Sequence, residues 1–254
     1  MKNDEIKQIV KTKYSKIAKG SCGCGNVSSC CSNSLSIKQL SESIGYSEEE
    51  INSASEANLG LGCGNPVALS TIKEGDIVLD LGSGAGFDAF LAAKKVGNKG
   101  KVIGLDMTEE MIRKAKENAE RYGYQNVEFR LGDIEHIPIE ANSIDVIISN
   151  CVINLSPNKE KVFSEAYRVL KSGGKMFVSD IVLLEELTQE QRNDEELIAG
   201  CVGGAILKDE YIKLIQNAGF KVKVLGEDKE ISKKQYNGIN LESIKIEATK
   251  EINK

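Results

Sequence analysis

The sequence predicts an α/β protein built on a doubly wound, mostly parallel sheet. Short apolar runs rich in β-branched residues recur between residues 58 and 184, and segments with helical periodicity separate them. The first of these runs ends in a glycine-rich turn, as expected where a strand meets a ligand-binding helix. Such alternation favours parallel strands with helices on both faces and ligands beyond the carboxyl ends of the strands.

Five runs in this region are predicted strands: 77–82, 101–106, 127–133, 144–150 and 175–183. Predicted helices follow the first strand through Phe90 and Leu91, begin after Thr108 as an N-cap, and span about 162–170. Segments 221–225 and 243–248 also resemble strands. These elements give the order strand, helix, strand through the centre of the chain.

We divide the chain into three regions. Residues 1–57 form a helical and cysteine-rich extension, 58–184 form the core, and 185–254 form a small α+β region on the substrate side. Ile6, Val10, Tyr14 and Ile17 fall at helical spacing, which predicts an N-terminal helix. The Ser- and Gly-rich stretch 21–34 favours a loop.

The composition of the chain argues against several classes of function. A net charge of −5 without a dense basic stripe argues against nucleic-acid binding. The chain lacks a run of about 18 apolar residues and an apolar export signal, so we expect a soluble, cytoplasmic protein without a membrane partner. His136 is the single histidine, which largely excludes HExxH zinc sites and Ser-His-Asp triads.

The turn after the first strand predicts a site for a cationic nucleotide ligand. Gly82, Gly84 and Gly86 let a ligand approach the backbone closely, and Asp80 precedes them. A dinucleotide fingerprint would need a glycine at Phe87, so the match to that motif is imperfect. A carboxylate beside the turn suits an ammonium and a sulfonium better than a pyrophosphate. The turn alone is a weak signal, because tight packing also selects glycine.

Acids at the ends of two further strands strengthen this prediction. Asp106 ends the second strand, where a carboxylate can accept both ribose hydroxyls, and Asp133 follows the third, where it could meet the adenine amino group. Either one alone could be a solvated acid or a helix cap. Together with Asp80 they indicate an S-adenosylmethionine site, whose further predicted contacts are Ser83, Met107, Ile134 and Asn150.

The chain has seven cysteines, and in a reducing compartment we expect them to be thiols. Cys63 precedes the first strand, Cys151 follows the fourth and Cys201 lies beyond the fifth. A single free cysteine is often only a small buried apolar residue. The end of the fourth strand borders the ligand pocket of a doubly wound sheet, however, and the other two cysteines could fold over the same opening.

Three thiolates without a histidine indicate a soft, three-coordinate acceptor. Zinc would need four ligands, usually with C-x2-4-C spacing, which these positions do not offer. Trivalent arsenic takes three sulfurs and keeps a lone pair that can attack a sulfonium methyl group. We therefore predict that Cys63, Cys151 and Cys201 bind As(III), with no general base because the arsenic carries no proton.

Eight segments of the chain form a recognisable set: LGCGNP, LDLGSGAGFD, GLDMT, GDIEHIP, SNCVINLSP, RVLKSGGK, SDIV and GCVGGA. Together they resemble the arsenite S-adenosylmethionine methyltransferases, a family with the class I methyltransferase, Rossmann-like fold. The resemblance spans about residues 58–207, and SNCVINLSP with GCVGGA is more specific than the segments shared by many methyltransferases.

The resemblance implies that Cys151 and Cys201 hold the arsenical and that Cys63 belongs to the same thiol set. It also implies that these cysteines reduce the As(V) product and form a disulfide, which a thiol reductant such as thioredoxin or glutathione reopens. Some family members use a further upstream cysteine. Of the four candidates we choose Cys31, with Cys30 close behind, although the loop could also capture metalloid without a defined role; the others are Cys22 and Cys24.

Three other functions fit parts of the pattern. A class I methyltransferase of a small organic acceptor, such as a quinone, would make the three cysteines incidental. A thiol protein that binds metalloid without catalysis would not need the intact set of Asp80, Gly82 and Asp106. A nicotinamide dehydrogenase is disfavoured by Phe87.

Overall fold

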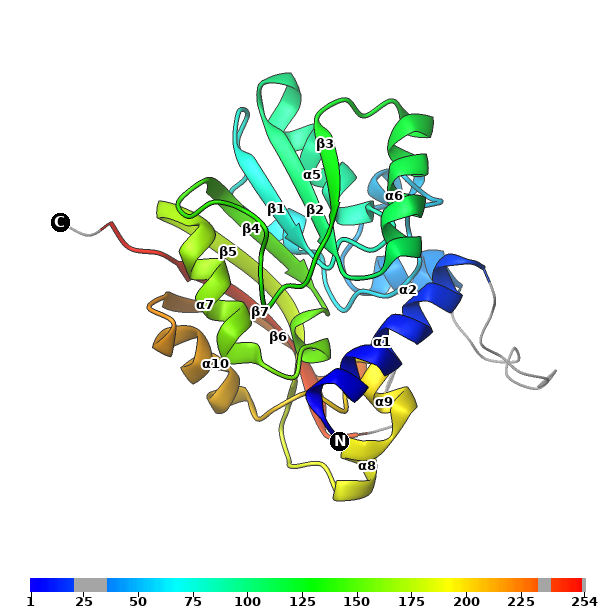
Figure 1. Ribbon diagram of the computed structural model, residues 1–254, viewed down its shortest axis with the longest axis vertical. Helices are drawn as coiled ribbons and strands as arrows, with labels where there is room; N and C mark the ends of the chain where they lie inside the picture. Colours follow the sequence, from blue (N-terminus) through cyan, green and yellow to red (C-terminus); the bar gives the residue numbers. More distant parts are fainter. Residues whose placement is uncertain (21–35, 233–238, 253–254) are drawn as a thin grey trace.

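A seven-stranded sheet forms the centre of the computed structural model, which describes residues 1–20, 36–232 and 239–252 (Figure 1). The strand order is β3-β2-β1-β4-β5-β7-β6. Strands β1 to β5 are parallel, and β7 lies antiparallel between β5 and β6. The strands are β1 Ile77–Leu81, β2 Lys101–Asp106, β3 Val127–Leu131, β4 Ile144–Asn150, β5 Leu170–Leu183, β6 Lys221–Asp228 and β7 Leu241–Thr249.

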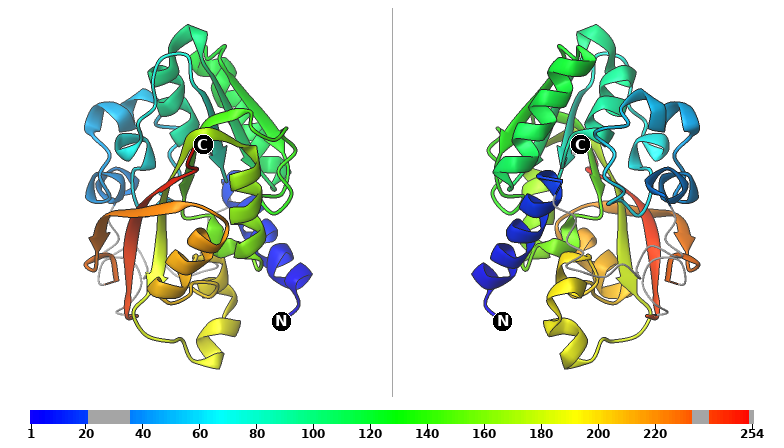
Figure 2. Two further views of the ribbon diagram at one scale, coloured as in Figure 1. Left: turned by 90° about the vertical axis from the view of Figure 1, so that its left-hand side faces the viewer. Right: turned by 90° about the vertical axis from the view of Figure 1, so that its right-hand side faces the viewer.

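Helices cover both faces of the sheet, and α7 and α10 lie side by side on one of them (Figures 1 and 2). None of the helices in the described part of the chain combines the length and apolar character needed to cross a bilayer. The helices are α1 Asn3–Ala18, α2 Ile37–Ser43, α3 Glu48–Ser53, α4 Pro66–Leu69, α5 Phe87–Val96, α6 Glu109–Tyr122, α7 Lys159–Val169, α8 Gln189–Asn193, α9 Glu195–Ala199 and α10 Lys208–Asn217, with 3-10 turns η1 Gly97–Lys99 and η2 Ile153–Leu155.

Alternating side chains of the strands divide the core into two layers. Val78 of β1 packs with residues of α5 and α6, in a cluster that contains Phe90. Its neighbour Leu79 points to the other face and packs with Phe163 of α7 and Tyr211 of α10. Burial on both faces explains why these strands appear in the sequence as continuous apolar runs.

The fold class and the central strands are confirmed, with differences at the ends. Strand β5 begins at Leu170, before the predicted 175, because Leu170 already pairs with Ile144 of β4. Strand β3 ends at Leu131, because the chain then turns and Asp133 bridges to His136. The C-terminal region adds β6 and β7 to the same sheet.

Thr108 occupies the N-cap position of α6, as predicted, but its side chain does not cap the helix. It hydrogen-bonds instead with the Asp106 carboxylate. The predicted cap and the carboxylate at the end of β2 therefore form one unit that fixes the start of α6 against the sheet.

The predicted N-terminal helix is present as α1, which runs between α6 and α9 (Figure 1). Val10 is buried, and the neighbouring Ile6 and Tyr14 pack against a cluster that contains all three core cysteines. The cysteine-rich stretch 21–34, with Cys31, lies outside the described residues. The apolar side of α1 thus packs over the carboxyl edge of the sheet.

Candidate active site

A pocket opens at the carboxyl ends of β1, β2 and β4. It lies where the strand order reverses, with β2 on one side of β1 and β4 on the other, which is where open α/β sheets bind ligands. Every predicted cofactor contact except Gly86 lines it: Asp80, Gly82, Ser83, Gly84, Asp106, Met107, Asp133, Ile134 and Asn150. Cys151 lines it as well. The pocket therefore joins the nucleotide side to one of the cysteines.

The glycine turn has a backbone that side chains rarely tolerate. Gly82, Gly84 and Gly86 have φ values of +70°, +52° and +97°. A Cβ on Gly82 would collide with the side chain of Val152, whereas one on Gly84 would meet no described atom within 4 Å. The turn thus packs tightly at Gly82 and leaves open space at Gly84, as a ligand-binding turn requires.

Two buried polar atoms beside this turn lack partners. Oδ2 of Asp80 and Oγ of Ser83 have no hydrogen-bond partner among the described residues, although both atoms are buried. Burial raises the pKa of Asp80 well above its usual range, and the nearby Asp88 and Asp106 raise it further. Buried, unpartnered acids favour a cation. The residues therefore fit a ligand that brings both a positive charge and hydroxyl or amino groups, as S-adenosylmethionine does.

Asp106 anchors the turn to the next strand. Its carboxylate accepts hydrogen bonds from the backbone N–H of Thr108 at 2.8 Å and of Gly84 at 3.0 Å. Because each carboxylate oxygen can accept more than one hydrogen bond, the predicted ribose contact stays compatible with these bonds. Burial raises the pKa of Asp106 in spite of them.

Asp133 is paired with Lys7 of α1, and its side chain stays partly exposed. The ammonium group of Lys7 lies 2.6 Å from a carboxylate oxygen of Asp133 and 2.6 Å from one of Glu135. The other oxygen of Asp133 accepts the N–H of Glu135. Lys7 lines the pocket but had no signal in the sequence, because its two partners lie more than a hundred residues away. The predicted adenine contact of Asp133 stays a prediction.

Asn150 ties the loop of Cys63 to the end of β4. Its Oδ1 accepts the N–H of Cys63 at 3.0 Å, and its Nδ2 donates to the carbonyl of Gly64 at 2.8 Å. The same Nδ2 lies 2.9 Å from the Tyr46 hydroxyl and 3.0 Å from a carboxylate oxygen of Asp88. A cofactor contact was predicted for Asn150, and it does line the pocket. Its amide, however, is engaged in placing Cys63.

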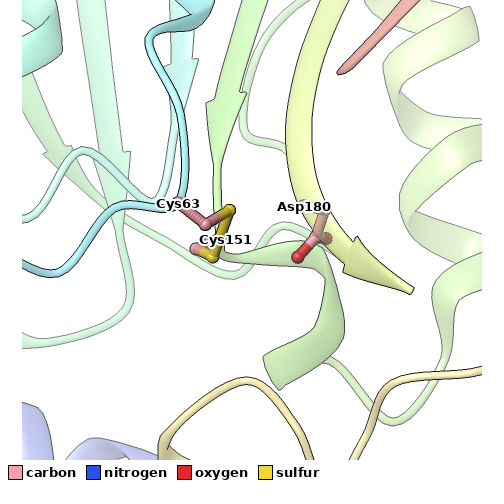
Figure 3. A group of neighbouring side chains, drawn as sticks. All are labelled: Cys63, Cys151 and Asp180. Atoms are coloured by element: carbon pink, nitrogen blue, oxygen red, sulfur yellow. A yellow bond between two sulfur atoms is a disulfide. The ribbon is translucent and has the colours of Figure 1, made fainter. Parts of the chain in front are cut away.

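Cys63 and Cys151 are joined by a disulfide, with their Cα atoms 6.0 Å apart (Figure 3). This differs from the expected free thiols, because the loop held by Asn150 lies directly against the residue that follows β4. Figure 3 shows the Asp180 side chain of β5 beside the sulfurs, and one ligand atom from each of the three residues lies within 4.8 Å of the others. Sequence analysis missed Asp180, although an acid inside the apolar run of β5 was a signal.

Cys201 is a buried free thiol next to this pair. Its sulfur donates to the carbonyl of Cys151 at 2.7 Å, and Tyr14 of α1 hydrogen-bonds with it. Burial raises the pKa of the Cys201 thiol far above its usual range, and Asp180 adds to the shift. Among the described residues, Cys201 is not part of the group whose ligand atoms lie within 4.8 Å of one another. The three cysteines are neighbours, but a shared three-sulfur site stays a prediction.

Two of the three cysteines have a backbone conformation that favours glycine. Cys151 has φ +55° and Cys201 has φ +67°, whereas Cys63, also described, does not share this conformation. Left-handed φ values in residues other than glycine and asparagine are uncommon and concentrate at functional sites. The backbone strain at both positions is therefore consistent with the predicted role of their thiols.

The fold and this pocket are those of a class I S-adenosylmethionine-dependent methyltransferase. The sequence profile of a methyltransferase domain family matches residues 72–219. The chain is 44% identical to an arsenite methyltransferase of Halobacterium salinarum, over 86% of this chain and 58% of that protein. It is 36% identical to the human arsenite methyltransferase, over 87% of this chain and 59% of that one.

The solved structure of CrArsM, an arsenic(III) S-adenosylmethionine methyltransferase from Chlamydomonas reinhardtii, superimposes with a TM-score of 0.63 at 33% identity. It covers 86% of this chain, which in turn covers 74% of CrArsM. The chain belongs to the arsenite methyltransferase family. It spans just under three-fifths of the length of the Halobacterium and human relatives.

The strained backbone at Cys201 leads to a stability test. We expect Cys201→Gly to be more stable than Cys201→Ala by about 1 kcal/mol, because glycine adopts the left-handed φ without strain. Both variants lack the thiol, so their difference isolates the backbone. At Cys63, where φ is not left-handed, we expect the opposite order. Urea denaturation under reducing conditions measures both pairs, and equal stability of the Cys201 variants would contradict the strain.

The buried acids lead to a pH test. Burial raises the pKa of Asp88 from 3.8 to about 6 in spite of hydrogen bonds from Tyr46 and Asn150. The folded state then holds this proton more tightly than the unfolded state, so stability is lost as pH rises from about 4 through 6. We expect Asp88→Asn to flatten the fall in urea midpoint between about pH 5 and pH 6. Glu128→Gln, whose folded pKa is lowered to about 2, serves as a control that keeps the slope.

Proposed function

We propose that this chain transfers methyl groups from S-adenosylmethionine to trivalent arsenic, as arsenite or methylarsenite, held by Cys63, Cys151 and Cys201, and that it serves arsenic detoxification. The observation that carries the proposal is the position of Cys151. It lines the same pocket as Asp80 and the glycine turn, and it is bonded to Cys63 and contacted by Cys201. A sulfur-bound acceptor would thus lie at the edge of the cofactor site.

The residues divide into a part for the cofactor and a part for the acceptor. We assign Asp80, Ser83, Gly84 and Asp106 to hold S-adenosylmethionine, with Gly82 and Gly86 shaping the turn and Met107, Asp133, Ile134 and Asn150 completing the contacts. Bound there, S-adenosylmethionine would supply a methyl group on a positively charged sulfur. The unpartnered carboxylate oxygen of Asp80 would offset part of that charge.

The acceptor part needs reduced cysteines. Thiolates bonded to arsenic donate electron density and make its lone pair a better nucleophile, while the surrounding loops fix its position. The Asn150 hydrogen bonds hold the Cys63 loop where its sulfur reaches that of Cys151. Cys31 is proposed as the upstream thiol that acts as a partner to Cys63.

A reductant completes the proposed cycle. The disulfide between Cys63 and Cys151 is the state expected after the two thiolates have reduced an As(V) product. A dithiol such as thioredoxin, or glutathione, would return both to thiolates. We further propose that the enzyme works in the cytoplasm, where such reductants are available.

The deciding experiment incubates the purified chain with arsenite, S-adenosylmethionine and a thiol reductant, and then separates the arsenic species. We expect methylated arsenic, and we expect Cys151→Ser to abolish it while S-adenosylmethionine still binds. Single Cys→Ser changes at Cys22, Cys24, Cys30 and Cys31 identify the upstream thiol. Cofactor binding without methylated arsenic would favour a small organic acceptor, whereas arsenite binding without cofactor binding would favour a metalloid-binding protein.

The cofactor assignment has its own test. We expect Asp106→Ala to weaken S-adenosylmethionine binding by about 1–3 kcal/mol, because it removes charge-assisted hydrogen bonds. Isothermal titration calorimetry measures the affinity, with arsenite binding as the control that should not change. An unaltered cofactor affinity would show that the ribose is placed elsewhere.

A further inference from the structure

Asp180 stands beside the proposed acceptor site, and the proposed function does not yet use it. Its side chain, on β5, is fully buried, and a carboxylate oxygen lies within 4.8 Å of the sulfurs of Cys63 and Cys151 (Figure 3). The sulfur of Cys63 comes from the loop before β1, and that of Cys151 comes from the residue that follows β4. An atom bonded to both sulfurs therefore lies close to the carboxylate.

The surroundings of Asp180 fix its position by hydrogen bonds. One oxygen accepts the side-chain amide of Asn154 at 2.9 Å and the N–H of Ile181 at 2.9 Å. The other accepts the hydroxyl of Tyr211 at 3.0 Å. An asparagine could make an equivalent set, because its oxygen would accept the first two bonds and its amide could donate to the tyrosine oxygen. These hydrogen bonds thus require a side chain with two polar atoms at this position, but they do not require a negative charge.

A buried charge without a structural need is costly, so a cation close by is a reasonable counterpart. Lys159 is one cation whose charge acts on both Asp180 and Cys201, but its ammonium group bonds to the carbonyl of Ser156. Asp180 also raises the pKa of the Cys201 thiol, which opposes the free thiolate. The same negative charge becomes favourable once the sulfurs are bonded to a centre that turns positive.

Methyl transfer to arsenic creates such a centre. A trivalent arsenic bonded to three thiolates is neutral. When its lone pair forms the As–C bond, the bond between the methyl carbon and the donor sulfur breaks, and that electron pair stays on sulfur. Arsenic is thereby oxidised from As(III) to As(V), and the positive charge of the sulfonium passes to the arsenic.

We propose that Asp180 is a catalytic residue whose carboxylate stabilises the positive charge developing on sulfur-bound arsenic. The inference rests on the proposed function and deepens it, since it assigns a charge complement to the acceptor rather than to the methyl donor. A full unit charge about 5 Å away at an effective dielectric of about 20 corresponds to roughly 10²-fold in a rate constant, and a partly developed charge to less.

The test compares wild type, Asp180→Asn and Tyr211→Phe under reducing conditions. In Asp180→Asn we expect methyl transfer in a single turnover to slow by about 10- to 100-fold, with arsenite affinity unchanged within about threefold, because the bound As(III) complex is neutral. Tyr211→Phe removes one hydrogen bond to the same carboxylate but keeps the charge, so both quantities should stay close to wild type. Equilibrium dialysis measures arsenite affinity.

A second readout does not depend on turnover. Cd²⁺ bound to the thiolates of Cys63 and Cys151 can take the carboxylate oxygen of Asp180 as a further ligand, since one ligand atom from each of the three residues lies within 4.8 Å of the others, so Asp180→Asn should weaken cadmium binding at least tenfold while arsenite affinity holds. The ultraviolet thiolate-to-cadmium band reports it. If wild type fails to methylate arsenite, the proposed function fails, and the cadmium comparison still decides whether the Asp180 carboxylate reaches an atom bound to the two sulfurs.

Two results would overturn the proposal. One is a variant Asp180→Asn with wild-type transfer rate and wild-type cadmium affinity. The other is an equal loss of arsenite and cadmium affinity, which would show a purely structural role. If the asparagine variant does not fold, Asp180→Ser, smaller and also neutral, provides the same comparison.

Discussion

The site depends on one amide group, that of Asn150. Its oxygen and nitrogen hold the backbone on both sides of the Cys63 sulfur, through the N–H of Cys63 and the carbonyl of Gly64. Since Asn150 ends β4 and Cys151 follows it, the same residue sets the approach of the two cysteines. Its contacts with Tyr46 and Asp88 carry this constraint to the N-terminal helices and to α5. The Cys63 loop, which is far from β4 in sequence, is thereby held in a fixed position against the sheet.

Charge gives the site a second organising principle. Asp80, Asp88, Asp106 and Asp180 are buried acids, and burial raises the pKa of each. Three of them lie around the glycine turn and one beside the cysteines. Isolated buried carboxylates oppose folding, whereas a ligand with positive charge relieves them. This arrangement suits a reaction in which a positive charge enters on one reactant and leaves on the other.

The sequence was informative where local chemistry decides structure. Apolar runs buried on both faces predicted β1 to β5, and the glycine turn with Asp80 and Asp106 predicted the pocket. The position of Cys151 beside the pocket followed from topology, since it comes directly after β4 at the switch point, whereas the approach of Cys63 depends on the loop that Asn150 holds. Contacts between side chains far apart in sequence could not be read in this way. Lys7 with Asp133, Asn150 with Cys63 and Tyr46 with Asp88 depend on how α1, α2 and the loops dock. Even a local prediction can fail: Thr108 was expected to cap α6, but the nearby Asp106 carboxylate takes the hydrogen bond of its side chain.

The left-handed backbone at Cys151 and Cys201 has an evolutionary consequence. A single base change converts a cysteine codon into a glycine codon, and at these two positions the exchange relieves strain instead of adding it. Mutation to glycine at either position therefore removes the thiol without the backbone cost that any other replacement would meet. The backbone itself does not select for cysteine at either position, so its retention depends on what the thiol does.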